Sequence, residues 1–327
     1  MGEFELLARI RERLPADGRR IHLGSGDDAA VTVPGGATAT SVDALVDGVH
    51  FRRELASLAQ IGHKALATAL SDLAAMGAEP GEAYAALGVP PDLDENGCIG
   101  LLDGLLELAA ATGTSIAGGD VTRAEKLFLA ITVVGHATGP ESFVGRSGAR
   151  PGDALVLSGE VGGAAAGLLL LDRPGLGEKV PAATAERLRA RQLEPHPRLD
   201  AGRALAAAGA TAMIDLSDGL GGDAVHLARS SGAGLRIDAD AMPLADGVAE
   251  IAAAAGRDPL DLAVSGGEDY ELLASIPPGR LAEAKRLVGD AEGIALTQIG
   301  EVVAGAGVEI RLPDGRLLEP EGFDQLA

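Results

Sequence analysis

The sequence predicts a two-domain α/β protein whose N-terminal half is of the α+β type. Hydrophobic residues make up 46% of the 327 residues, and segments of helical and extended apolar spacing follow one another along the chain. A stretch rich in Gly, Ser, Pro and Arg interrupts this pattern at residues 139–152. We therefore expect an N-terminal domain over residues 1–138 and a C-terminal α/β domain over residues 139–327.

Charge and composition exclude several classes of function. The formal net charge is −21, aromatic residues are 2% of the chain and Trp is absent, so we expect no nucleic-acid partner. If the ligands carry phosphates, metal ions must supply most of the positive charge. The single cysteine, Cys98, excludes an internal disulfide. No targeting pattern or membrane-length apolar run is visible, and we expect a cytoplasmic protein without a membrane partner.

The N-terminal half predicts the order helix, β, β, α, β, α, β, β. The expected helices span residues 3–14, 57–76 and 94–112, and the expected strands span 29–33, 37–42, 83–89, 115–117 and 127–137. The turn Pro34-Gly35-Gly36 between the first two strands predicts a β-hairpin. That hairpin would bring Asp28 and Asp43 together at one end, where like charges destabilise the pair unless a cation separates them.

Two further acidic residues of this half lie at unusual places. Asp72 projects within the apolar sector of the helix predicted over residues 57–76, so it needs a partner, either a metal ion or a basic residue such as Lys64. Asp120 follows Gly118-Gly119, and glycines there allow a backbone to approach a ligand closely. The motif in isolation favours the alternative, a plain Gly-Gly-Asp hairpin turn.

The boundary region and the chain after it contain two features suited to phosphate. Arg146 and Arg150 are notable in so acidic a chain, because guanidinium groups bind phosphate oxygens well, although solubility of a linker explains them too. The glycine-rich segment at residues 158–167 fits neither a P-loop nor a dinucleotide fingerprint, so tight helix packing is an equal explanation.

The stretch from Met213 to His226 predicts a strand, an acidic loop and a helix. Asp215 and Asp218 flank Ser217 after a short apolar run, and glycines precede a segment of helical spacing. A hard cation between these carboxylates and a phosphate is one interpretation. This stretch by itself favours the simpler one, in which Ser217 or Asp218 caps the helix.

Acidic residues recur where a strand or an apolar helix meets glycine, which surface charge alone does not explain. The set comprises Asp27, Asp28, Asp43, Asp72, Asp120, Asp215, Asp218 and Glu268. Several Mg²⁺ ions between these acids and a nucleoside triphosphate form a coherent site, because Mg²⁺ binds carboxylates together with substrate phosphates. Phosphoryl transfer depends on alignment and charge neutralisation, so we assign no catalytic general base.

The motifs that carry these acids resemble, in type and order, those of the thiamine-monophosphate kinase family, within the ATP-binding superfamily of aminoimidazole ribonucleotide synthetase. They are Gly26-Asp27-Asp28, Ser41-Val42-Asp43, the Leu70–Gly77 segment LSDLAAMG, Gly118-Gly119-Asp120, Asp215-Leu216-Ser217-Asp218-Gly219-Leu220 and the Ser265–Tyr270 segment SGGEDY. The resemblance spans essentially the whole chain, from Gly2 to Phe323.

This resemblance implies a homodimer whose N-terminal domains pair their sheets, and ATP- and Mg²⁺-dependent conversion of thiamine phosphate to thiamine diphosphate by direct transfer. Carried over by motif, the magnesium ligands are Asp28, Ser41, Val42, Asp43, Asp72, Asp120, Asp215 and Asp218, with Val42 offering only its backbone carbonyl. The residues implied at ATP are Gly119, Asp120, Arg146 and Ser217, and those facing thiamine phosphate are His50, Glu268 and Phe323. Relatives often have Thr at the position of Val42 and Trp or Tyr near that of Phe323.

Three other functions are compared with this one. An aminoimidazole ribonucleotide synthetase-type ligase or cyclase would need an Asp-Gly-Val-Gly-Thr-Lys segment, whereas this chain has a different sequence from Asp43 to Phe51. A selenophosphate synthetase would need a reactive Cys near the N-terminus, and Cys98 lies too late in the chain. A non-catalytic, metal-dependent nucleotide sensor belongs to a separate class, and steady ADP formation with thiamine phosphate would separate it from a kinase.

Overall fold

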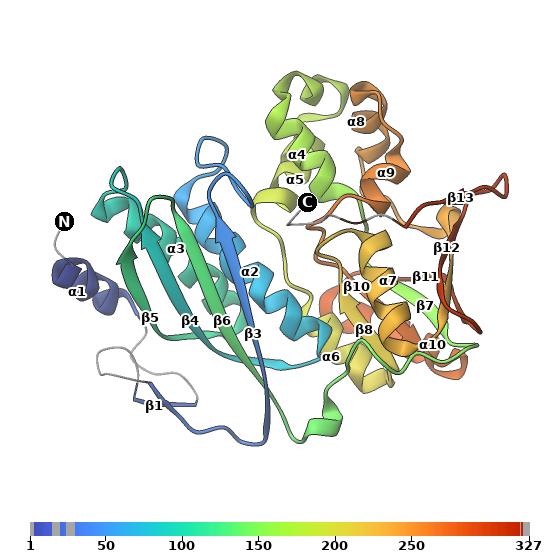
Figure 1. Cartoon of the computed structure of the whole chain (residues 1–327), viewed down its shortest axis with the longest axis horizontal. Helices are drawn as coiled ribbons and strands as arrows, with labels where there is room; N and C mark the ends of the chain where they lie inside the picture. The colour runs from blue at the N-terminus through green and yellow to red at the C-terminus, as the bar shows by residue number, and fades with distance from the viewer. Residues whose placement is uncertain (1–2, 15–19, 24–29, 321, 323–327) are drawn as a thin grey trace. The chain divides into compact units, whose positions relative to one another are not determined.

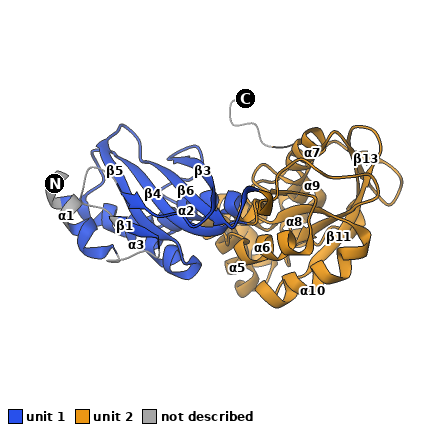
Figure 2. Ribbon diagram, turned by 90° about the horizontal axis from the view of Figure 1, so that it is seen from below, with its two compact units in different colours: residues 1–73, 78–140 blue, residues 74–77, 141–327 orange. Residues whose placement is uncertain are grey.

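The structure is a computed structural model that describes residues 3–14, 20–23, 30–320 and 322. The chain divides into two compact units. Unit 1 comprises Met1–Leu73 and Ala78–Pro140, and unit 2 comprises Ala74–Gly77 and Glu141–Ala327; Figure 2 shows them in blue and orange.

Unit 1 is built on a four-stranded sheet in the order β3-β6-β4-β5. Its elements are α1 (Glu3–Arg13), β1 (Ile21–Leu23), β2 (Val31–Thr32), β3 (Ala37–Val46), α2 (Leu58–Ala75), β4 (Glu79–Val89), α3 (Glu95–Thr112), β5 (Ser115–Arg123) and β6 (Phe128–Ala137). β3 and β4 run antiparallel to β6, whereas β4 and β5 are parallel. Helices α2 and α3 cover one face of this sheet (Figure 1). The mixed sheet with helices that the sequence predicts is therefore confirmed.

The ends of the two long helices of unit 1 follow their capping residues. Ser57 Oγ accepts the Gln60 N–H at 3.2 Å while Gln60 Oε1 accepts the Ser57 N–H at 3.0 Å, a reciprocal capping box before α2. Asp94 accepts the Gly97 N–H at 2.8 Å and begins α3, and Gly113 ends it with φ of 71°. Both helices were predicted within a residue or two of these ends.

The predicted β-hairpin of residues 29–33 and 37–42 is wrong. Strand β2 pairs with β1, whereas β3 pairs along its whole length with β6. Pairing with β6 satisfies ten residues of backbone and buries Leu45, while Val31 and Val33 stay exposed. Pro34-Gly35-Gly36 therefore connects two strands that do not pair with each other. Asp28, the other carboxylate of that prediction, lies outside the described residues.

Unit 2 is built on a seven-stranded sheet in the order β13-β12-β9-β11-β7-β10-β8. Its strands are β7 (Ala154–Ser158), β8 (Ala212–Asp215), β9 (Gly234–Asp238), β10 (Leu272–Ile276), β11 (Leu296–Val303), β12 (Gly307–Arg311) and β13 (Leu317–Leu318). The pair β9–β12 is parallel and the other pairs are antiparallel. Every residue of β7 and β10 is buried, so helices cover the sheet on both faces.

The described part of unit 2 contains seven helices besides its sheet. They are α4 (Gly163–Asp172), α5 (Ala182–Leu193), α6 (Leu199–Ala208), α7 (Leu220–Ser231), α8 (Val248–Ala255), α9 (Pro259–Val264) and α10 (Leu281–Glu292), with short 3₁₀ turns at Pro140–Ser142, Pro174–Lys179, Ala239–Ala241 and Pro278–Arg280. Helix α9 was not predicted from the sequence, although Asp258 before Pro259 is a helix-start signal, and Asp258 accepts the Leu260 N–H at 2.9 Å. The α/β class of this half is confirmed. No helix in the described part of either unit is long and apolar enough to cross a bilayer.

The glycine-rich segment at residues 158–167 serves helix packing. A Cβ atom on Gly167 would lie 2.0 Å from the Leu188 carbonyl oxygen, so only glycine lets α4 and α5 approach this closely. At Gly163 a Cβ atom would lie 2.5 Å from Arg191 Cδ. Of the two explanations left open by the sequence, close packing is the one seen at these positions.

We predict that Gly167→Ala lowers the free energy of unfolding by about 1–3 kcal/mol, because the added methyl group meets backbone that cannot move without separating two helices. Gly175→Ala is the matched control, since nothing lies within 4 Å of its Cβ position. Urea unfolding followed by circular dichroism measures both, and equal stabilities of the two variants would contradict the packing role.

Candidate functional site

Strand β3 and helix α2 bring two of the predicted metal ligands together in unit 1. The Ser41 hydroxyl donates a hydrogen bond to Asp72 Oδ2. Burial, the charge of Asp72 and a hydrogen bond to Asp72 together raise the pKa of Asp43 to about 6, with burial the largest cause. Asp72 therefore meets a hydroxyl and a second carboxyl group on the helix-covered face of the sheet. Two carboxyl groups this close need a proton or a cation between them.

Asp120 lies on the opposite face of the same sheet. The register aligns Asp43 with Ile131 and Ala85, whereas Asp120 aligns with Ala86 and Ala130, one residue out of step. Because side chains alternate between faces along a strand, Asp43 points toward the helices and Asp120 points away from them. Strands β6 and β4 also separate β3 from β5, which is three strand spacings or about 14 Å. Within one unit 1, these two carboxylates are not brought together.

Val42 and Gly119 lie next to these acids. Val42 is 63% exposed on the face that Asp120 shares, so its side chain is free of the core. Gly119 packs so tightly on β4 that a Cβ atom would lie 2.0 Å from the Ala85 carbonyl oxygen. Glycine at 119 is thus required for strand pairing, whatever ligand Asp120 meets.

His50 lies in the turn that follows β3. The Val46 N–H donates to His50 Nδ1 at 3.1 Å, so the neutral ring carries its proton on Nε2. This contact fixes the orientation of the ring, so the Nε2–H group points in a defined direction. The arrangement suits a residue that binds an anion by donation and does not require it to act as a base.

The loop between β8 and α7 carries the acids of unit 2. Asp215 is buried at the end of β8, and Ser217 and Asp218 are partly exposed in the loop. The N-cap of α7 is Gly219, with φ of 104° and no side-chain cap. The interpretation of Ser217 or Asp218 as a helix cap is therefore wrong, because the positive φ at this position requires the glycine instead.

Asp223, in the first turn of α7, was missed by the sequence analysis. Its side chain is 3% exposed and accepts the Asp218 N–H at 3.1 Å, and the Ser217 backbone also hydrogen-bonds to it. Burial raises its pKa to about 8, and the charge of Asp215 contributes. Its position in the first helical turn, reaching back to residues before the cap, was the available signal. Asp223 sets the shape of the loop that presents Ser217 and Asp218.

Glu268 lies in a strained loop that is fastened to the same acidic loop. Its φ is 69° and that of Tyr270 is 49°, both in the left-handed region that disfavours side chains. The Glu268 N–H donates to the Ser217 carbonyl at 2.8 Å, and the Tyr270 N–H donates to the Leu216 carbonyl at 2.9 Å. Strain of this kind persists only where the surroundings hold it, and it gathers at functional sites.

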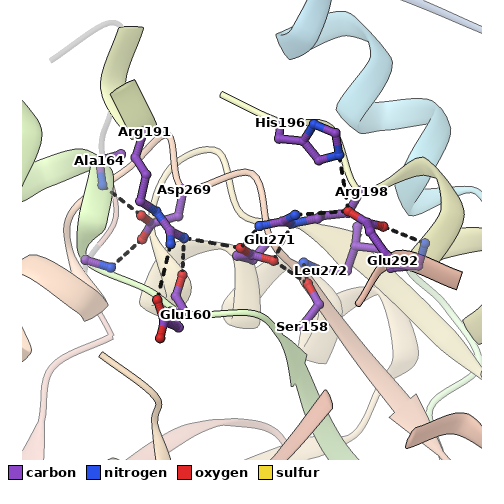
Figure 3. A network of polar contacts seen from close by, with 12 residues as sticks. Ser158, Glu160, Ala164, Arg191, His196, Arg198, Asp269, Glu271, Leu272 and Glu292 are labelled. Atoms are coloured by element: carbon purple, nitrogen blue, oxygen red, sulfur yellow. Dashed lines mark hydrogen bonds and ion pairs between the residues drawn. The ribbon is translucent and has the colours of Figure 1, made fainter. Parts of the chain in front are cut away.

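A buried polar network holds the residues that follow Glu268 in this loop, Asp269 and Glu271, and Figure 3 shows it. Asp269 accepts the N–H groups of Gly162, at 2.6 Å, and Ala164, at 3.0 Å, at the start of α4. Burial raises the pKa of Asp269 to about 6, against the lowering influence of Arg191. The chain's own carboxylate thus occupies the helix N-terminus that the sequence analysis considered for phosphate.

The second carboxylate of the network is Glu271, which is fully buried. It accepts from Arg198 Nη2 at 2.6 Å, from Arg191 Nη2 at 3.2 Å and from Ser158 Oγ at 2.6 Å. Arg198 also reaches Glu292 at 3.0 Å. These residues carried no recognisable motif, because their partners lie far away in sequence.

The remaining predicted site residues are less defined. Arg146 is exposed in the segment between β6 and β7, and its backbone carbonyl accepts from Ser231 Oγ at 3.1 Å. Asp28 and Phe323 lie outside the described residues. Among those that are described, no three His, Cys, Asp or Glu side chains lie close enough together to hold a metal ion.

Known proteins share both halves of this architecture. The model of the AIR synthase related protein N-terminal domain matches residues 26–137, and that of the C-terminal domain matches residues 150–313. The chain is 37% identical over 331 residues to the thiamine-monophosphate kinase of Escherichia coli O157:H7, covering 100% of this chain and 98% of the relative. The chain belongs to the thiamine-monophosphate kinase family. The family resemblance found in the motifs is thereby confirmed.

Solved structures agree with this membership. The thiamine-monophosphate kinase from Stenotrophomonas maltophilia K279a has a TM-score of 0.84 at 35% identity, covering 97% of this chain and 98% of that one. The structure of AaThiL complexed with AMPPCP and TMP has a TM-score of 0.78 at 32% identity, covering 98% and 96%. The full two-unit architecture is therefore that of the family.

Asp223→Asn should change how stability depends on pH. Because the native pKa is about 8 and the unfolded value is 3.8, the native state keeps a proton that the unfolded state has lost between these values. Stability of the metal-free wild type should therefore fall as pH rises through this window, with up to about 1.4 kcal/mol per pH unit from this group. The variant should lack that contribution.

Urea unfolding in the presence of a chelator measures this effect between about pH 5 and about pH 8. The chain has no Trp, so circular dichroism is the suitable signal. Asp240→Asn, at an exposed carboxylate of the same unit, is the control. The same pH slope in wild type and Asp223→Asn would show that Asp223 is ionised in the native state.

Proposed function

We propose that this chain transfers a phosphoryl group directly from ATP to thiamine phosphate, forming thiamine diphosphate, with Mg²⁺ bound by its acidic loops. The observation that carries the proposal is the fastening of two loops in unit 2, where Ser217 accepts the Glu268 N–H at 2.8 Å. One loop bears the residues expected at nucleotide and metal, and the other bears the residue expected at thiamine phosphate. Full-length similarity to thiamine-monophosphate kinases supports the same reaction.

The donor set in unit 1 fits Mg²⁺. Ser41, Asp43 and Asp72 offer only oxygen atoms, and Mg²⁺ binds one or two carboxylates and completes its octahedron with water and substrate phosphates. The raised pKa of Asp43 marks a place where negative charge is not yet neutralised. We propose that these residues hold Mg²⁺ together with Asp28 and the Val42 carbonyl, that Asp120 binds Mg²⁺ separately on the opposite face of the sheet, and that Asp215 and Asp218 bind it in unit 2. When bound, the ions neutralise the charge of the two phosphates that must meet.

The protein's own groups bind and orient the substrates in this proposal. The acceptor is a phosphate anion that needs no deprotonation, so no side chain has to act as a general base. His50 Nε2, whose ring is fixed through Nδ1, donates to thiamine phosphate, and Glu268 faces its cationic portion. Gly119, Arg146 and Ser217 contact ATP, and Phe323 is proposed at thiamine phosphate. The cytoplasmic location expected from the sequence stays a prediction.

We further propose that the N-terminal domains, with the boundary near residue 138, pair through the sheet face that carries Asp120. Val42 is 63% exposed on that face, as expected for an apolar residue that a second copy covers. Pairing this face with a second copy would also give Asp120 neighbours that its own chain does not offer.

Asp43→Asn should fold and lose about 100-fold or more in turnover, because the substitution removes a carboxylate proposed to hold the Mg²⁺ that neutralises phosphate charge. Coupled measurement of ADP formation with ATP, Mg²⁺ and thiamine phosphate checks this. Glu107→Gln, at an exposed acid of α3, is the control. Full activity of Asp43→Asn at limiting Mg²⁺ would contradict the ligand role, and ADP formation independent of thiamine phosphate would contradict the kinase reaction.

Val42→Arg should shift the protein from dimer to monomer in sedimentation analysis, because a charge at the proposed contact opposes burial. Leu168→Arg is the matched control, since Leu168 is an apolar residue of unit 2 that is 40% exposed. Dimers of unchanged strength in Val42→Arg, or a monomeric wild type, would exclude pairing through this face.

A further inference from the structure

Gln192 holds the side chain of Glu268 from a neighbouring helix. It lies in the last turn of α5, is 5% exposed, and its Nε2 donates a hydrogen bond to Glu268 Oε2. The two residues are 76 positions apart, so the contact exists only in the folded unit. Burying the Gln192 amide costs free energy unless the amide makes a hydrogen bond. Its bond to the partly exposed Glu268 carboxylate meets that need.

The backbone of Glu268 is already fixed by other contacts. Its N–H is bonded to the Ser217 carbonyl at 2.8 Å, and the next residue, Asp269, is anchored to the Gly162 N–H at 2.6 Å. These bonds determine where the Cα atom of Glu268 lies and keep its φ at 69°. They do not determine the direction of its carboxylate, since a glutamate side chain has several rotatable bonds beyond Cα.

We propose that Gln192 is a positioning residue that directs the Glu268 carboxylate toward thiamine phosphate, and this rests on the proposed function. Thiamine phosphate carries a cationic thiazolium ring, which a carboxylate of fixed direction recognises. An amide donor suits this task because it orients a carboxylate without adding a charge that competes with the substrate cation. An arginine or lysine at position 192 would also orient Glu268, but its positive charge would repel the cationic ring of the substrate.

The support differs from that given by the network around Glu271. Arg198 and Ser158 bind Glu271 and fix the start of β10, so their loss would disturb the whole loop. Gln192 contacts the end of one side chain. Its removal should therefore affect recognition of thiamine phosphate and spare the binding of ATP.

The test compares Gln192→Leu, which removes the donor at similar volume, with Thr184→Val. Thr184 is buried in the same helix, and its hydroxyl donates to Asp246 at 3.2 Å, away from Glu268. Calorimetric titration with thiamine phosphate in the presence of a non-hydrolysable ATP analogue gives affinities, and steady-state assays give the KM for each substrate. Gln192→Met provides a second variant if Gln192→Leu does not fold.

We expect thiamine phosphate to bind the Gln192 variants about ten-fold more weakly, with a matching rise in its KM, while the KM for ATP stays within about two-fold. Thr184→Val should bind like wild type. Unchanged affinity in both Gln192 variants, or equal losses in Thr184→Val, would overturn the positioning role alone. A wild-type protein that binds no thiamine phosphate would overturn the proposed function and this inference with it.

Discussion

Repulsion between carboxylates that the fold places side by side is the constraint on which the functional parts of both units depend. In unit 1 burial and Asp72 raise the pKa of Asp43 to about 6, and in unit 2 burial and Asp215 raise the pKa of Asp223 to about 8. Such pairs lower stability unless protons or cations reduce their charge. Binding of a divalent ion relieves this repulsion, so sites of this kind favour divalent ions.

Unit 2 offsets that cost with a network of buried ion pairs beneath the strained loop. Glu271 and Asp269 are buried, and Arg198, Arg191 and backbone N–H groups replace the lost hydration. Because each carboxylate has several donors, the loop has one arrangement and the positive φ of Glu268 is maintained. Rigidity at this place matters for phosphoryl transfer, in which alignment of two bound substrates is most of what a protein contributes.

The sheet of unit 1 distributes its acids over two faces. Ser41 and Asp43 turn toward α2, while Asp120 turns to the other side from the far edge of the sheet. The first face packs against helices of the same chain, and the other carries Asp120 and the exposed Val42 on opposite edge strands. The sequence suggested that these acidic motifs form one site. Because the acids lie on two faces of the sheet, the motifs occupy separate surfaces within one unit.

The sequence by itself determined the features that depend on neighbours along the chain. Capping residues such as Ser57 and Asp94 placed helix ends, apolar spacing placed most helices and strands, and the order of acidic motifs identified the family. Only the tertiary structure decided that β3 pairs with β6, which face each acid takes, and that Gln192 meets Glu268. These contacts join residues far apart in sequence, and the burial that selects them depends on every layer packed around them, which no local pattern records.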